Sequence, residues 1–285
     1  MIINKNVKIA FVVFGVIFCI YYFFNNKDYF LPKPPAKERI GTISLSPEDT
    51  EILFELGAQD VVGVCDTCNY PQKTALVKKM GSSASPDMAA VLGANPQKVF
   101  INADASEETL AALREHNIKI ITIPTPHNVE DIFFNINFVA ANIDKNSADL
   151  IKELKNIADA RKPAEAKVFV AAGDNFLTVG YPNFINDILR YAGLQNIFGN
   201  VGEEFFNTSW QSVSAQNPDI IIDLSADTIN YGALPGAENV NAVKNRRIYK
   251  LQDPYLLSLP TPRAIRNISK LKELAAEVNQ KPSVM

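Results

Sequence analysis

The sequence predicts an α/β fold: two Rossmann-like α/β lobes joined by a long α-helix and preceded by an N-terminal transmembrane helix. Three observations carry this prediction. From residue 39 onward, short apolar runs alternate with helix-like stretches that end at Gly or Pro, which is typical of parallel α/β layers. The alternation stops over residues 128–163, which have a helical pattern, and then restarts. Residues 9–24 are apolar and uncharged and differ from the rest of the chain.

The N-terminal segment, residues 1–26, is predicted to be a membrane anchor. Lys5 and Lys8 precede the apolar run, and the tyrosines and asparagines after it extend it toward the length that spans a bilayer. No small-residue cleavage site follows, and Phe18 rather than a small residue precedes Cys19, which argues against lipid attachment. We therefore expect an uncleaved, single-pass anchor, with a cleaved signal peptide as the alternative.

Residues 27–38 contain three prolines and alternating charges, a composition that stays extended, and they are predicted to form a stalk. The formal net charge of -3 gives no basic excess that could neutralise a phosphate backbone. Nucleic acid is therefore an unfavourable partner.

Residues 39–127 are predicted to form the first lobe. Its strands are expected at residues 40–45, 61–64, 99–102 and 119–123, and its helices at 47–56, 87–92 and 107–116. The helical connector follows at 128–163 and is expected to be interrupted near residues 142–146, with Asp144 as the N-cap of its second part. The second lobe, residues 164–285, has expected elements at 167–171, 183–192, 209–216, 220–224, 240–243, 248–251 and 262–278.

The two lobes repeat one unit, in which a helix ends at Asn-Pro and a strand follows. Asn95-Pro96 leads into the strand at 99–102, and Asn217-Pro218 leads into the strand at 220–224. Asn-Pro also ends helices in unrelated proteins, which is the alternative explanation. Two similar lobes on a stiff helix predict a cleft between them, the usual place for a ligand.

Several short motifs support a family assignment. They are Ser44-Leu45-Ser46-Pro47, Thr50-Glu51, Leu56-Gly57, Gly63-Val64-Cys65-Asp66, Asn69-Tyr70-Pro71, Val179-Gly180, Asn196-Ile197-Phe198, Asn217-Pro218-Asp219 and Pro262-Arg263. This set resembles the helical-backbone, or class III, periplasmic substrate-binding proteins, which serve importers of cobalamin, siderophores and haem. The loop around Tyr70 is most similar to the cobalamin-binding members. The resemblance implies a protein without enzymatic activity or cofactor that captures cobalamin, or a related corrinoid or metal chelate, outside the cytoplasm and passes it to an ABC importer permease.

The resemblance also implies a set of ligand-binding positions in the cleft. They are Thr67, Tyr70 and Ser83 in the first lobe and Phe176, Phe205, Asp253 and Tyr255 in the second. Aromatic faces pack on a flat macrocycle and a carboxylate accepts hydrogen bonds from its amides. Ser83 stands where some cobalamin binders have a tryptophan. Ordinary core packing is the alternative for Phe176 and Phe205.

Importer-coupled family members dock through one glutamate per lobe. The matching positions here are Ala89 and Gln211, so both docking charges are missing. Trp210, beside Gln211, is either an apolar docking residue or part of the packing of its own lobe. These departures favour a rival hypothesis, a membrane-anchored interaction protein that has lost importer docking.

Cys65 and Cys68 form a C-x-x-C motif that permits three states: a disulfide, two free thiols, or a redox or ligand role. A thiol oxidoreductase is therefore a third hypothesis, although no general base lies nearby in sequence. The chain has only His116 and His127, too few for the histidine-rich metal sites of this fold, so no bare metal site is expected.

Overall fold

The structure is a computed structural model that describes residues 5–25, 38–103, 105–159, 163, 166–226, 229–251 and 255–279. It divides into two units, Met1–Arg39 and Ile40–Met285. The described part of the first unit contains one helix, α1 (Lys5–Asn25). Residues 26–37, which include most of the predicted stalk, lie outside the described part.

The prediction of a transmembrane helix is not supported. Among the residues that the structure describes, no helix is both long enough and apolar enough to cross a bilayer.

The first half of the second unit contains a parallel five-stranded sheet of order β3-β2-β1-β4-β5. Its strands are β1 (Thr42–Ser44), β2 (Val61–Val64), β3 (Lys78–Lys79), β4 (Lys98–Asn102) and β5 (Lys119–Ile123). The helices are α3 (Pro47–Glu55), η1 (Gln72–Leu76), α4 (Met88–Gly93) and α5 (Glu107–Glu115). Ser46 caps α3 by accepting from the Asp49 amide at 3.2 Å, which satisfies one of the free N–H groups at the helix start.

Sequence reasoning located most of these elements within one or two residues and missed β3 and η1. Both missed elements are short, and β3 is an edge strand of two exposed lysines with no apolar pattern. Pairing with β2 holds it in the sheet, and that contact is not visible in its own sequence.

The connector is not a single long helix: it is divided into two helices at the interruption predicted near residues 142–146. It consists of α6 (Val129–Asn142) and α7 (Ala148–Ile157). Asp144 is not the N-cap of α7: it adopts a left-handed φ of 53° in the turn between the helices, and Ser147 precedes α7. Asp and Asn tolerate this backbone region better than most residues, so Asp144 helps to end the connector's first helix rather than to start its second.

The second half contains a parallel four-stranded sheet of order β11-β10-β6-β8 and an antiparallel pair, β7-β9. The strands are β6 (Ala166–Ala171), β7 (Leu177–Val179), β8 (Leu194–Asn196), β9 (Phe205–Asn207), β10 (Ile220–Asp223) and β11 (Ile248–Lys250). The helices are α8 (Phe184–Tyr191), α9 (Trp210–Gln216), η2 (Tyr231–Ala233), η3 (Ala237–Asn239), α10 (Asn241–Lys244), α11 (Tyr255–Ser258), α12 (Pro262–Arg266) and α13 (Ile268–Asn279). The helix expected over 262–278 is thus divided at Asn267.

The repeated Asn-Pro unit has the same backbone in both halves. Asn95 has φ 49° and Asn217 has φ 48°, both in the left-handed region. Each follows a helix, α4 or α9, and leads into an inner strand of its sheet, β4 or β10. Asn tolerates this conformation, which ends the helix, and the following Pro prevents its continuation.

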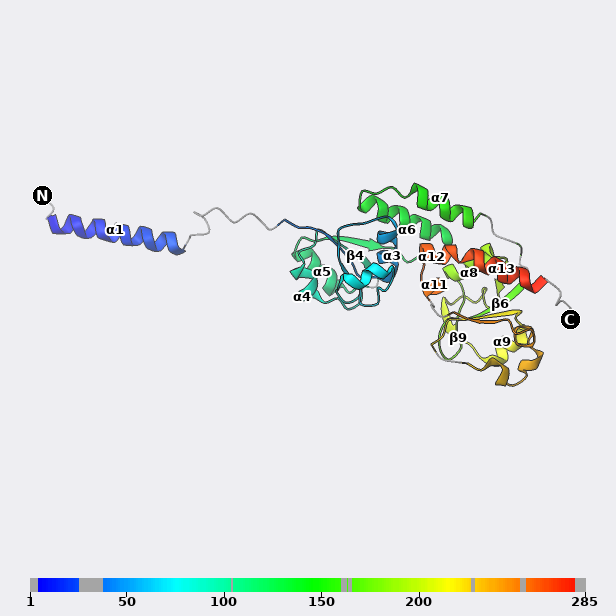
Figure 1. Ribbon diagram of the computed structural model, residues 1–285. Coiled ribbons are helices and arrows are strands. Elements are labelled where there is room, and N and C mark those ends of the chain that lie inside the picture. Colours follow the sequence, from blue (N-terminus) through cyan, green and yellow to red (C-terminus); the bar gives the residue numbers. More distant parts are fainter. Residues whose placement is uncertain are drawn as a thin grey trace. The chain divides into compact units, whose positions relative to one another are not determined.

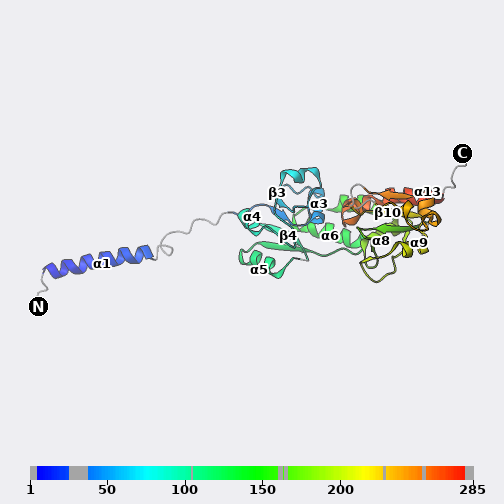
Figure 2. The same ribbon diagram turned by 90° about the horizontal axis from the view of Figure 1, so that it is seen from below.

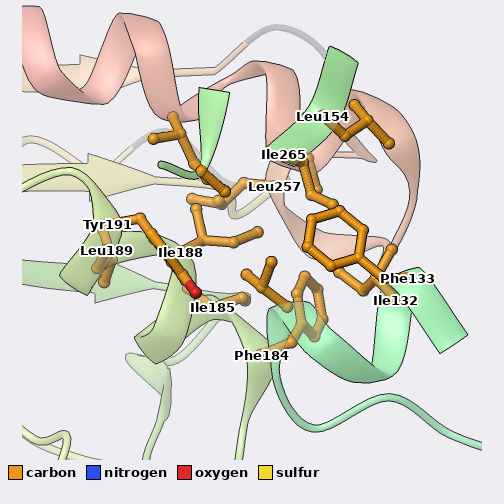
Figure 3. Packing of buried hydrophobic residues seen from close by; sticks show 14 of the residues in the cluster. Ile132, Phe133, Leu154, Phe184, Ile185, Ile188, Leu189, Tyr191, Leu257 and Ile265 are labelled. Atoms are coloured by element: carbon orange, nitrogen blue, oxygen red, sulfur yellow. The ribbon is translucent and has the colours of Figure 1, made fainter. Parts of the chain in front are cut away.

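One hydrophobic cluster runs through both halves. It joins Ile52 and Phe100 of the first half to Val168 and Phe184 of the second. Helix α6 lies between them and packs against α3 on one side and α8 on the other (Figures 1 and 2). Figure 3 shows Ile132 and Phe133 of α6 directed toward Phe184 and Ile185 of α8 and toward Ile265 of α12. The halves therefore share a core and do not have separate ones at this boundary.

Phe133 and its neighbour Phe134 give a matched test of this shared core. Phe133 is 4% exposed and Phe134 is 56% exposed on the same helix. We expect Phe133→Ala to lower the free energy of unfolding by about 3–5 kcal/mol because it leaves a cavity in the core. Phe134→Ala should change it by less than about 1 kcal/mol.

Urea unfolding, followed by far-UV circular dichroism and by the fluorescence of the single tryptophan, Trp210, measures both values. Trp210 lies in the second half, in a different cluster from Phe133. Since the halves share a core, Phe133→Ala should shift both signals together. A shift in circular dichroism alone would show that the second half unfolds independently.

Candidate ligand-binding site

The loop after β2 carries Thr67 and Tyr70 and is held at several points. Cys65 and Cys68 form a disulfide, and both are buried beneath the loop. The Thr50 hydroxyl lies 3.1 Å from Cys68 Sγ, and Lys79 Nζ donates to the Cys68 carbonyl at 2.5 Å. The loop backbone is thus fixed, while Thr67 is exposed and the Tyr70 side chain is 36% exposed.

Arg263, on α12, contacts this loop from the second half. Its guanidinium carbon lies 3.8 Å from the centre of the Tyr70 ring, a cation–π contact. Its Nε donates to Glu51 Oε2 at 2.7 Å, and its backbone N–H donates to Glu51 Oε1 at 3.2 Å. One face of Tyr70 is therefore covered by the protein itself, and the ring is held in a defined orientation.

The pair formed by Glu51 and Arg263 is almost fully buried. The side chains are 1% and 10% exposed. Burial raises the pKa of the Glu51 carboxyl, and the contacts with Arg263 lower it again in part. Next to this pair, Arg266 donates to Glu55 on α3 at 2.8 Å and to Glu153 on α7 at 2.7 Å. Two arginines of α12 thus fasten the second half to the first half and to the connector.

Sequence reasoning assigned no role to Glu51 or Arg263. Both were noted only as members of short motifs, Thr50-Glu51 and Pro262-Arg263. The available signal was the presence of opposite charges in segments that are otherwise apolar and buried, since such charges almost always pair.

Ser83 is buried, and its hydroxyl is hydrogen-bonded within the protein. It is 3% exposed, its hydroxyl donates to the Leu45 carbonyl at 3.1 Å, and it accepts from the Asn102 amide at 3.1 Å. These bonds link the ends of β1 and β4. The position that holds a tryptophan in some cobalamin binders is therefore part of the sheet edge here.

The two predicted phenylalanines lie at opposite ends of the β7-β9 pair. Phe205 is 49% exposed and pairs with Val179. Phe176 is partly buried against a hydrophobic cluster of the second half and has a left-handed φ of 55°. Phe205 thus keeps an accessible ring, whereas Phe176 contributes to packing. Asp253 lies outside the described residues, as does the side chain of Tyr255 at the start of α11.

Of the predicted docking residues, Ala89 and Gln211 are exposed and uncharged. Trp210 is 8% exposed, its Nε1 donates to the Pro235 carbonyl at 2.9 Å, and its ring lies 6.1 Å from that of Tyr231. Trp210 is therefore packed within its own half, as the packing alternative predicts.

Two cavities flank the second half, and none of the predicted ligand residues lines either one. The larger, of about 580 Å³, lies beside α8, and the smaller, of about 290 Å³, lies beside β11 and α13. Over the described residues, no group of three or more His, Cys, Asp or Glu side chains is arranged to hold a metal ion. The residues that the structure does bring together are Thr67, Tyr70 and the unpredicted Arg263.

Removal of the Arg263 side-chain charge should leave the buried Glu51 carboxylate without its ion-pair partner, which is destabilising. We expect Arg263→Met to lower the free energy of unfolding by about 3–5 kcal/mol at pH 7. The loss should shrink as the pH falls, because burial raises the pKa of the Glu51 carboxyl and protonation removes the charge that Arg263 balances.

Urea unfolding at pH 7 and pH 5 measures the effect, with Glu51→Gln/Arg263→Met as the matched control. The double variant carries no buried charge at this position and should lose less stability than Arg263→Met at pH 7. An equal loss at both pH values would show that the charge of Glu51 does not cause the destabilisation.

A family model described as "Periplasmic binding protein" matches residues 43–255. An uncharacterized ABC transporter substrate-binding lipoprotein, YvrC, of Bacillus subtilis is 26% identical over 273 residues, which covers 87% of this chain and 82% of that protein. A vitamin B12-binding protein of Vibrio vulnificus is 24% identical over 255 residues, covering 84% of this chain and 91% of that protein.

Solved structures show the same fold. The periplasmic heme-binding protein RhuT from Roseiflexus sp. RS-1, in apo form, has a TM-score of 0.71 at 23% identity, covering 85% of this chain and 100% of that one. The periplasmic vitamin B12-binding protein BtuF of Vibrio cholerae has a TM-score of 0.64 at 17% identity, covering 84% and 98%. The family model spans most of the chain, including both sheets and the connector between them, and the chain therefore belongs to the periplasmic binding protein family.

Proposed function

We propose that this protein captures cobalamin, or a related corrinoid, outside the cytoplasm and passes it to an ABC importer. The observation that carries the proposal is Tyr70, a half-exposed ring held by Arg263 at the end of a disulfide-closed loop. A ring that is already oriented loses little entropy when a flat macrocycle packs on it. The proposal places the ligand between this loop and Phe205 in the second half.

The choice of a corrinoid over other chelates is supported by two features. The relatives named above include a vitamin B12-binding protein that is similar over 84% of this chain. The positions proposed to bind ligand are mostly uncharged, and a corrinoid has a periphery of neutral amides. The Cys65–Cys68 disulfide also suits an oxidising compartment outside the cytoplasm.

Handover to a permease is part of this proposal. Ala89 and Gln211 are exposed at the positions where importer-coupled family members present glutamates. Docking on these positions would rely on shape and polar contacts, because no charge-assisted pair can form there. The protein is therefore proposed to serve a permease whose docking surface does not need a negative charge at these two positions.

Isothermal titration of the full chain with cyanocobalamin tests the proposed ligand. We expect binding, weakened roughly tenfold by Tyr70→Ala and by Phe205→Ala because each removes an aromatic contact. Phe134→Ala, which removes a ring of similar exposure from α6, serves as the control and should leave affinity unchanged.

Titrations with haem and with a ferric siderophore complete the test. Binding of either one in place of cyanocobalamin, with the same sensitivity to Tyr70→Ala, would replace the corrinoid by that chelate. Absence of binding by all three would overturn the receptor proposal and favour an interaction protein.

A further inference from the structure

The cavity of about 580 Å³ beside α8 has a size typical of small-molecule sites. Its walls are the start of α6, the Tyr181–Pro182 turn, one side of α8, strand β8 and the turn at residues 199–200. The sequence prediction of a ligand site in the cleft did not include any of these residues. We call this cavity the α8 groove.

The floor of the α8 groove is a fixed network of amide groups. Asn196 Nδ2 donates to Asn186 Oδ1 at 2.7 Å and to the Val179 carbonyl at 2.8 Å. Asn186 Nδ2 in turn donates to the Gly180 carbonyl, and Asn196 Oδ1 accepts from the Phe198 amide at 3.1 Å. Both side chains are buried. A floor whose hydrogen bonds are already made does not need to reorganise when a ligand binds.

The side chains at the rim of the groove, unlike those of its floor, are exposed. His127, Tyr181, Arg190, Gln195 and Asn200 line it, and all five are exposed. Over the described residues, their side chains have no hydrogen-bond or ion-pair partner within the protein. Tyr181 is 62% exposed, so its ring is accessible at the edge of the groove. The rim thus offers unused donors and acceptors around one open ring face.

One polar group at the end of the groove also lacks a partner although it is buried. Asn183, which lines the groove, is 2% exposed and accepts from the Ile185 amide at 2.9 Å. Its Nδ2 has no acceptor in the described part of the protein. This donor has almost no exposed surface, so its missing acceptor is a cost to the fold and not a contact for a guest in the groove.

The charges in the groove indicate a neutral guest. Arg190 and Asp187 lie one turn apart on α8, and Asp187 also accepts from the Val129 amide at 3.1 Å. One positive and one negative charge leave little net field for an ion, and Tyr181, Gln195 and Asn200 are uncharged residue types. Gln195 and Asn200 each combine a donor with an acceptor, which matches hydroxyl groups that both donate and accept.

We propose that the α8 groove is a second ligand site, which takes a neutral saccharide about the size of a disaccharide. The ring of Tyr181 packs on the apolar C–H face of the sugar, and Arg190, Gln195 and Asn200 bind its hydroxyl groups. The site shares no residue with the proposed corrinoid site, so it does not depend on that proposal.

Saturation-transfer NMR and isothermal titration of the full chain test the site with glucose, N-acetylglucosamine and maltose as neutral probes. Glucuronate and glucose 6-phosphate are the anionic counterparts. We expect binding of at least one neutral sugar. Tyr181→Ala should weaken it roughly three- to tenfold, and Gln195→Ala/Asn200→Ala roughly tenfold, from the lost ring contact and hydrogen bonds. Phe134→Ala is the matched control and should leave sugar affinity unchanged.

Three outcomes would overturn the proposal: no binding of any neutral sugar, binding of the anionic sugars alone, or sugar binding that Tyr181→Ala and Gln195→Ala/Asn200→Ala leave unchanged. Cyanocobalamin affinity, measured on the same variants, separates the two proposals. Tyr181→Ala should leave it intact, and a failure of cyanocobalamin to bind would leave the saccharide result standing.

Discussion

The packing of α6 between the two sheets is the constraint on which the rest of the structure depends. Its buried face touches α3 on one side and α8 on the other, so the two halves share one core. The arginines of α12 reinforce this boundary, since Arg263 pairs with Glu51 and Arg266 pairs with Glu55 and Glu153. A buried ion pair adds little net stability, but separating its partners is costly. The pair therefore fixes the relative placement of the halves more than it adds to their stability.

This placement has a direct consequence for the ligand site. Arg263 belongs to the second half, yet it orients Tyr70 in the first. The disulfide between Cys65 and Cys68 fixes the same loop from below. Tyr70 is thus held from both halves, and a movement that separated them would also release its ring. The site proposed for the corrinoid is therefore built into the boundary between the halves and is not a feature of either one alone.

The sequence alone predicted the fold class well and the site only in part. Alternating apolar runs and caps such as Ser46 and Gly57 are local signals, so the strands and helices around them could be located. Elements that depend on partners far away in sequence, such as β3 and the β7-β9 pair, have no local pattern and were missed. The same reason explains why the pairing of Glu51 with Arg263 was not predicted, since the two residues are more than 200 positions apart in the sequence. Ser83 and Trp210 had residue types suited to a surface role, and only the fold shows that both are buried.

The relative placement of the halves can be measured directly by double electron–electron resonance spectroscopy. Nitroxide labels on Leu76→Cys in the first half and Glu238→Cys in the second report this placement, since both positions are exposed. A Cys19→Ser background removes the free cysteine, and the Cys65–Cys68 disulfide does not react with the label. The shared core predicts one narrow distance distribution, with the same mean before and after cyanocobalamin is added. Two populations, or a mean that shifts by many ångströms on addition of ligand, would contradict a single body and would require a hinge at α6.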